Sequence, residues 1–182
     1  MKKILISLAT TAILAFGATD ANKSSDSNIT IQEQQIPTFT LNDTTGGKIE
    51  IAQTSDGLDY KNFKDKNVIL FFYLYDGAPC QGQLATFKEV VKDKKDLEIV
   101  TIELKGLDKD GLAKYAKEKA LDFHMVTGKS AMNFVNYIAQ RAQWRGTVPF
   151  IIITNKKGAV KHIQIGAMNK EQLNKVLNSL NK

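Results

Sequence analysis

The sequence has few residues of several reactive types, and each shortage excludes a class of protein. A single cysteine, Cys80, cannot form an intramolecular disulfide, so the chain is not a disulfide-stabilised scaffold. Two arginines, Arg141 and Arg145, are too few for a nucleic-acid surface, and the net charge of +6 comes from lysines interspersed with acidic residues. The two histidines, His124 and His162, are distant from Cys80 in the sequence, so we expect no metal site and no cofactor.

The N-terminal stretch, residues 1–21, has the pattern of a secretory signal peptide. Two lysines precede the apolar run Ile4 to Gly17, which is too short for a stable membrane span, and small residues that suit cleavage follow it. The stretch contains no cysteine that could accept a lipid. We therefore expect cleavage after Gly17 or Ala21, and a periplasmic or otherwise exported protein whose mature form has no membrane span.

Composition divides the remainder of the chain into two parts. Residues 22–35 are polar and lack apolar periodicity, which predicts a flexible linker. Residues 36–182 have the length and the apolar content of one domain with a single core. We expect this second part to carry the folded structure and the functional site.

Apolar patterns in residues 36–182 predict alternating strands and helices. Strands are expected at 38–41, 48–51, 68–75, 97–104, 122–126, 150–154 and 159–165, with a polar connection at 52–66. Helices are expected at 81–91, after a cap at Asp108, after a cap at Ser130, and after Asn169, where Gln172 completes a capping box. This order predicts an α/β fold with a central mixed β-sheet, helices on both faces and an N-terminal β-hairpin.

One segment joins an apolar strand to the turn that holds the cysteine. Val68 to Cys80 reads VILFFYLYDGAPC, and a continuous apolar run of this kind is typical of a central strand covered on both faces. Cys80 falls near the first turn of the next helix, where the helix dipole favours a thiolate. Burial would instead make it an inert small apolar residue. The residues alone leave both states open.

Four motifs occur in an order and spacing that match a known family. They are Pro37-x-Phe39-x-Leu41 before a glycine-containing hairpin, the strand entering Gly77-Ala78-Pro79-Cys80, the Thr147-Val148-Pro149-Phe150 segment, and the Asn-x-x-Gly turn followed by Gly166. The chain thereby resembles the TlpA/ResA group of exported thioredoxin-like thiol–disulfide oxidoreductases. The resemblance implies a thioredoxin-like fold and a cis Pro149. It also implies that Gly77, Ala78, Pro79, Val148 and Pro149 contact an extended peptide or partner protein.

The resemblance fails at the reactive positions of the family's Cys-x-x-Cys motif. Gly77 stands where the family has its nucleophilic cysteine, and Cys80 corresponds to the resolving cysteine. Asp76 replaces a tryptophan, and its charge is expected to raise the pKa of a neighbouring thiol. Gln83 stands where many relatives have a glutamate, and Phe71 stands where thioredoxins bury an acid. The motif is therefore degenerate, and groups that manage protons are missing along with the nucleophile.

Three functions are compatible with this motif. The first is a redox-inactive or monothiol module that binds a partner in the Pro149 groove. The second is a monothiol disulfide oxidoreductase in which Cys80 forms mixed disulfides and an external thiol resolves them. The third is a one-cysteine, peroxiredoxin-like peroxidase. For that reaction Gly77 occupies the position of the required threonine or serine, and Arg145 is the arginine available to polarise a peroxide.

Several other side chains have alternative interpretations from the sequence. Trp144 either lines the Pro149 groove or packs in the core. His124 lies between apolar residues and fits a hydrogen-bonded core histidine, whereas His162 alternates with Ile163 on a strand and is expected to face solvent. Met125 and Met168 are assigned to packing.

Overall fold

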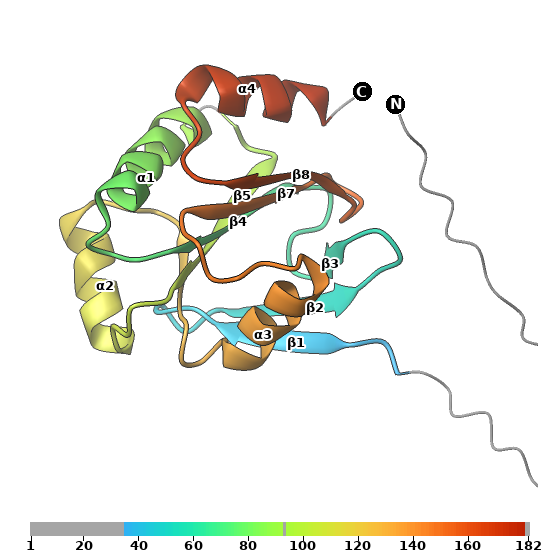
Figure 1. The fold of residues 1–182 in the computed structure, drawn as a ribbon, viewed down its shortest axis with the longest axis horizontal. Coiled ribbons are helices and arrows are strands. Elements are labelled where there is room, and N and C mark those ends of the chain that lie inside the picture. Colours follow the sequence, from blue (N-terminus) through green and yellow to red (C-terminus); the bar gives the residue numbers. More distant parts are fainter. Residues whose placement is uncertain (1–34, 93, 181–182) are drawn as a thin grey trace, which may run out of the picture. The chain divides into compact units, whose positions relative to one another are not determined.

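The computed structural model describes residues 35–92 and 94–180, and Figure 1 shows their arrangement. The expected signal peptide at 1–21, and all of the expected linker except residue 35, lie outside the described residues. The strands are β1 (Thr38–Asn42), β2 (Lys48–Gln53), β3 (Leu58–Tyr60), β4 (Asn67–Tyr73), β5 (Leu97–Glu103), β6 (His124–Thr127), β7 (Phe150–Thr154) and β8 (Val160–Ile165). The helices are α1 (Ala78–Val91), α2 (Lys109–Glu118), α3 (Met132–Arg141) and α4 (Lys170–Ser179).

The strands form a larger mixed sheet and a smaller antiparallel sheet. The larger sheet has the order β6-β5-β4-β7-β8, in which β4, β5 and β6 are parallel, and β7 runs antiparallel to both of its neighbours. The smaller sheet has the order β1-β2-β3. β4 lies at the centre of the larger sheet and is buried at every position, as its continuous apolar sequence predicts.

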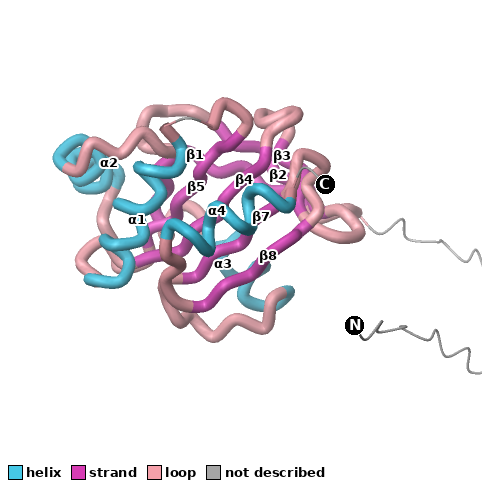
Figure 2. The backbone as a smooth tube through the Cα atoms, turned by 90° about the horizontal axis from the view of Figure 1, so that it is seen from above, coloured by secondary structure: helices cyan, strands magenta, loops and turns pink. Residues whose placement is uncertain are grey.

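Two layers cover the larger sheet, and each encloses a hydrophobic core cluster. α1 and α4 lie on one side, and α3 lies on the other side with β1 and β2 (Figures 1 and 2). The first cluster joins the sheet to α1, α2 and α4, and it contains Cys80. The second joins the opposite face to α3 and the smaller sheet. The predicted mixed sheet with helices on both faces is therefore confirmed. No helix within the described residues is long and apolar enough to cross a membrane.

The N-terminal hairpin contains one strand more than the sequence pattern predicts. Residues 52–66, expected to be a polar connection, include β3, which pairs with β2. Leu58 and Tyr60 are 3% and 4% exposed, and the exposed Asp59 lies between them. A strand of three residues offers a single alternation, which is too short a pattern to separate from a loop.

Two of the three predicted helix caps are present. The Asp108 carboxylate accepts from the backbone of Gly111 at 2.8 Å, and Asn169 and Gln172 form the predicted capping box of α4. The Ser130 cap is wrong, because α3 begins at Met132 with no side-chain cap. The Ser130 hydroxyl instead donates to the carbonyl of Thr127 at 2.9 Å, so it stabilises the preceding turn.

Candidate functional site

The turn between β4 and α1 places Cys80 inside the protein and the residues before it at the surface. Gly77 is the N-cap of α1, with an extended backbone (φ −73°, ψ 118°), and its carbonyl accepts from the backbone of Gln81 at 2.9 Å. Ala78 and Pro79 are exposed, and Gly77 is half-buried. Cys80 is 2% exposed and packs in the core cluster of α1. The sulfur atom of the turn is therefore covered, while Ala78 and Pro79 are at the surface.

The surroundings of Cys80 favour the neutral thiol. Burial raises the pKa of this thiol, and the Asp76 carboxylate raises it further, whereas a backbone hydrogen bond with Leu74 acts in the opposite direction. The neighbouring phenols of Tyr73 and Tyr115 bring no positive charge, and burial raises their pKa values as well. The expected effect of Asp76 on the thiol is thus present, and burial adds a larger effect of the same sign.

Asp76 is engaged by a lysine from the neighbouring loop. Its carboxylate accepts a hydrogen bond from the Lys105 ammonium, which lowers the pKa of Asp76 and raises that of Lys105. The same ammonium lies 5.4 Å from the centre of the Tyr75 ring. These three residues form a polar rim beside the Gly77–Cys80 turn.

Glu103, which no pattern in the sequence singles out, positions this rim. The side chain is fully buried at the end of β5. One carboxylate oxygen accepts from the backbone of Lys105 at 2.7 Å, and the other accepts from Gly106 at 3.0 Å and Leu107 at 2.9 Å. Glu103 therefore holds the loop that presents Lys105 to Asp76. The alternating pattern of β5 gave no signal for this role, because the partners are backbone groups of a loop.

The positions at which relatives carry acids have structural roles in this chain. Gln83 is 1% exposed, and its side-chain oxygen accepts from the backbone of Met168 at 2.6 Å. Phe71 packs in the core between the rings of Tyr73 and Phe87, whose centres lie 5.2 Å and 5.1 Å away. Neither side chain can carry a proton to or from Cys80.

The Val148–Pro149 segment lies next to the core that contains Cys80. The Val148–Pro149 peptide bond is cis, and Val148 is half-buried against the cluster that includes Cys80. The Pro149 carbonyl accepts from the backbone of Gly166 at 2.8 Å. Trp144 is 6% exposed and packs in the second core cluster. Its ring stacks on Phe150 with centres 4.6 Å apart, and its indole N–H donates to a backbone carbonyl.

A second polar cluster surrounds His124, away from the apolar setting that the sequence suggested. Its Nδ1 lies 3.1 Å from a carboxylate oxygen of Asp43, and its Nε2 lies 3.4 Å from one of Glu98. Lys66 pairs with the same Glu98, and the Phe63 ring packs on the imidazole with centres 4.8 Å apart. The cluster joins the tip of the β1–β2 hairpin to the edge of the larger sheet. Within residues 35–92 and 94–180, no group of three histidine, cysteine or acidic side chains is arranged to hold a metal ion.

The His124 cluster predicts a pH-dependent stability. The hydrogen bond to Glu98 raises the pKa of His124, and the bond to Asp43 adds to it, although burial opposes both. A histidine with a raised pKa contributes stability that is fully present below its ordinary pKa of 6.5. This stability is lost as the pH rises through the pKa that the histidine has in the folded protein. Burial works to raise the pKa of Asp43, but its hydrogen bonds outweigh burial, so the pKa is lowered. The hydrogen bond with His124 lowers the pKa of Glu98. Both carboxylates therefore contribute stability above pH 4.5, which is lost as the pH falls through their lowered pKa values.

We therefore expect His124→Gln to lower the free energy of unfolding by about 1–2 kcal/mol near pH 6, and by less near pH 9. Urea denaturation at the two pH values measures the difference. His162→Gln, which leaves the contacts of His124 in place, is the matched control. An equal loss from His124→Gln at both pH values would show that the charged form of the imidazole is not what holds the cluster.

Comparison with solved structures places the fold among thioredoxin-like proteins. StoA from Bacillus subtilis is 20% identical with a TM-score of 0.57, and the match covers 79% of this chain and 98% of that one. A thiol:disulfide interchange protein from Chlorobium tepidum is 15% identical with a TM-score of 0.62, covering 81% and 95%. A secreted Mycobacterium tuberculosis disulfide oxidoreductase homologous to E. coli DsbE is 15% identical with a TM-score of 0.59, covering 78% and 96%. These likenesses establish the thioredoxin-like fold.

A family model covers most of the described sequence. The comparison with curated proteins gave no match. The model of the AhpC/TSA family matches residues 33–163, which include the Gly77–Cys80 turn, the His124 cluster and the cis Pro149. The match covers more than half of the chain, and the chain belongs to the AhpC/TSA family.

Proposed function

We propose that the protein is a redox-inactive binding module of the TlpA/ResA type. One observation carries the proposal: Cys80 is 2% exposed, and the position three residues before it is the glycine Gly77. Dithiol exchange needs an exposed thiolate to attack the substrate and a second thiol to release the mixed disulfide. This turn supplies neither of them.

The surface that would bind a partner is built from the same turn. Ala78 and Pro79 are exposed, and Gly77 and Val148 are half-buried, so the surface that they form is accessible to an extended peptide or to a partner protein. The N–H and the carbonyl of Gly77 are bonded to Leu74 and Gln81 within the turn. Asp76 and Lys105 would border this surface with one charge of each sign. Pro149 is buried and would support Val148 from behind.

Export of the protein is part of the proposal. It is supported by the signal-like pattern of residues 1–21. The mature protein from its native host is expected to begin between Ala18 and Asn22. Mass spectrometry checks this, and an intact Met1 in a cytoplasmic fraction would contradict it.

The family match favours a peroxidase as the second candidate function. In that reaction the Cys80 thiolate would attack a peroxide, forming a sulfenic acid and releasing water or an alcohol. It would require Cys80 to become exposed and deprotonated, although burial raises its pKa. Gly77 offers no hydroxyl to the peroxide. The site therefore supports the binding module better.

Labelling of Cys80 by a thiol reagent separates these functions. We expect the native protein to react at least about 100-fold more slowly than the urea-unfolded protein, because the thiol is buried and protonated. The variant Ala85→Cys, which adds an exposed thiol to the same helix, is the control and is expected to label rapidly at the new position. Rapid native labelling with consumption of peroxide would identify a peroxidase. Rapid labelling without peroxide consumption would identify a monothiol oxidoreductase.

A further inference from the structure

The outer strand of the larger sheet, β8, exposes apolar side chains to solvent and half-buries the polar side chains that alternate with them. Ile163 and Ile165 are 49% and 58% exposed, whereas His162 and Gln164, which alternate with them, are half-buried. Within the described residues β8 pairs with β7 alone in the sheet, so its outer edge is open there. An open edge with exposed branched apolar residues is a surface that can take a further strand.

The backbone groups of the two exposed isoleucines point away from β7. Gly166 donates to the Pro149 carbonyl at 2.8 Å, and the register continues from this pair to Ile151 opposite Gln164 and Ile153 opposite His162. In an antiparallel pair, hydrogen-bonded and non-hydrogen-bonded positions alternate. Ile163 and Ile165 occupy the intervening positions, so their N–H and C=O groups face the open edge. The Gln164 side chain donates to the Ile165 carbonyl at 3.0 Å, and an added strand would displace it.

The first part of the same edge is already occupied by a short segment of the chain. The backbone of Val160 donates to the Asp56 carbonyl at 3.0 Å, and Gly57 forms an antiparallel bridge with Ala159. This pairing ends before Ile163. An added strand would therefore extend the pairing of Asp56 and Gly57 along the same edge of β8, beside Ile163 and Ile165.

An apolar groove lies where this short segment meets the edge. The groove has a volume of about 260 Å³ and is bounded by residues 54–58, by Tyr137 and Arg141 of α3, and by Ile163. Pockets for drug-sized ligands and cofactors begin at about 300 Å³, so this volume suits one or two side chains. We call this surface, with the open backbone of Ile163 and Ile165, the edge groove.

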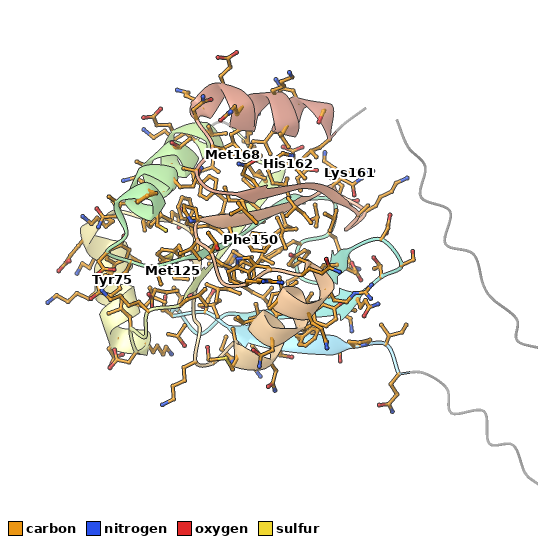
Figure 3. The ribbon with its side chains drawn as sticks, in the orientation of Figure 1. Tyr75, Met125, Phe150, Lys161, His162 and Met168 are labelled. Carbon is orange, nitrogen blue, oxygen red and sulfur yellow. The ribbon has the colours of Figure 1, made fainter. Side chains whose placement is uncertain are left out.

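The charges around the edge groove indicate the sign of its partner. Arg141 is exposed, and none of the ion pairs formed by the described residues involves it. β8 carries Lys161 and His162 at neighbouring positions (Figure 3) and has no acidic residue, while Asp56 is the carboxylate that lines the groove. A second copy of β8 would bring no acidic side chain to the groove and would leave Arg141 unneutralised. An acidic strand would neutralise it.

We propose that the edge groove binds an extended, acidic segment of a partner protein by strand addition to β8. Two apolar side chains of the segment would lie beside Ile165 and Ile163, and an acidic side chain on the same face would reach Arg141. This surface is separate from the Gly77–Cys80 turn: Lys161 lies on the opposite side of the view from Tyr75, which precedes that turn (Figure 3). Binding here is therefore independent of the chemistry of Cys80.

A seven-residue peptide with blocked ends tests the proposal. It has threonine at odd positions, valine at the second and fourth, and glutamate at the sixth, so that an antiparallel strand places the valines beside Ile165 and Ile163. We expect the full chain to bind it and the backbone amides of Ile163 and Ile165 to gain protection from hydrogen exchange. Replacing the glutamate by lysine, or methylating the two valine nitrogens, is expected to weaken binding at least tenfold.

Matched variants locate the binding surface on the protein. Arg141→Gln and the double variant Ile163→Thr, Ile165→Thr are expected to weaken binding at least tenfold, and Arg145→Gln, which changes the arginine outside the groove, is expected to leave it unchanged. Loss with Arg145→Gln alone would place the peptide elsewhere and overturn the proposal. Equal binding of the methylated peptide would overturn it as well. Protection of the Ile163 and Ile165 amides from hydrogen exchange without peptide would also overturn it. In a dimer, a second copy would then cover the edge, and in a monomer another part of the same chain would cover it. None of these outcomes changes the labelling of Cys80, so failure of the strand-addition proposal is distinct from failure of the proposed function.

Discussion

Gly77→Cys is expected to form an intramolecular disulfide with Cys80 under mild oxidant. A Cβ atom placed on Gly77 would lie 3.8 Å from the Cys80 Cβ and 3.5 Å from its sulfur. The mean Cβ–Cβ separation across protein disulfides is about 3.8 Å, so the turn already has the required spacing. The backbone of Gly77 has a φ of −73°, which any L-residue adopts without strain. Mass spectrometry with and without reductant measures the bond.

The same variant is expected to acquire weak activity. With a dithiol reductant, Gly77→Cys should reduce insulin disulfides about tenfold faster than the parent, because the new thiol lies at the N-terminus of α1 and Cys80 can resolve the mixed disulfide. The activity stays low because Asp76 disfavours the thiolate and Gln83 cannot carry a proton. Adding Asp76→Trp removes the negative charge and should raise the rate further.

Gly77→Ser is the control, since it fills the same space without a thiol. It should show neither the disulfide nor the activity. If Gly77→Cys does not pair with Cys80, the turn does not have the thioredoxin-like spacing on which the proposed function depends. If it pairs but gives no activity, the scaffold is intact, and the loss of function extends beyond the missing cysteine.

The features predicted correctly from the sequence are those that depend on neighbours in the chain. The continuous apolar run before Gly77 identified the central strand β4, and Asp108 and Asn169 were identified as caps because a cap bonds to the residue three positions later. β8 follows the turn signal at Asn155, but the expectation that His162 faces solvent is wrong. His162 is half-buried and Ile163 is exposed, because alternation alone does not say which face is covered.

The polar clusters could not be predicted, because their members come together only in the folded chain. Asp43 and His124 are 81 positions apart, and their contact depends on the hairpin tip reaching the sheet edge. Glu103 lies in an alternating strand whose pattern does not indicate its loop partners, and both faces of β5 are covered. Long-range polar contacts of this kind require the tertiary arrangement, which local pattern does not contain.

Glu103→Ala is expected to cause the largest loss of stability among the substitutions considered. The variant removes three hydrogen bonds from the backbone N–H groups of Lys105, Gly106 and Leu107 to a charged acceptor, and such bonds contribute about 1.5–3 kcal/mol each. We expect the free energy of unfolding in urea to fall by at least about 3 kcal/mol with an unchanged slope. Glu103→Gln keeps one acceptor oxygen and should lose about half as much.

Glu118→Ala is the control, because its exposed carboxylate lies 3.9 Å from Lys114 and should contribute under about 0.5 kcal/mol. The loss from Glu103→Ala should also reach the candidate site, since the same loop holds Lys105 against Asp76. In the Gly77→Cys background, Glu103→Gln is therefore expected to shift the pH dependence of insulin reduction toward higher pH, because an Asp76 without its lysine disfavours the thiolate more strongly. A stability loss with no such shift would make Glu103 a structural residue with no influence on the turn.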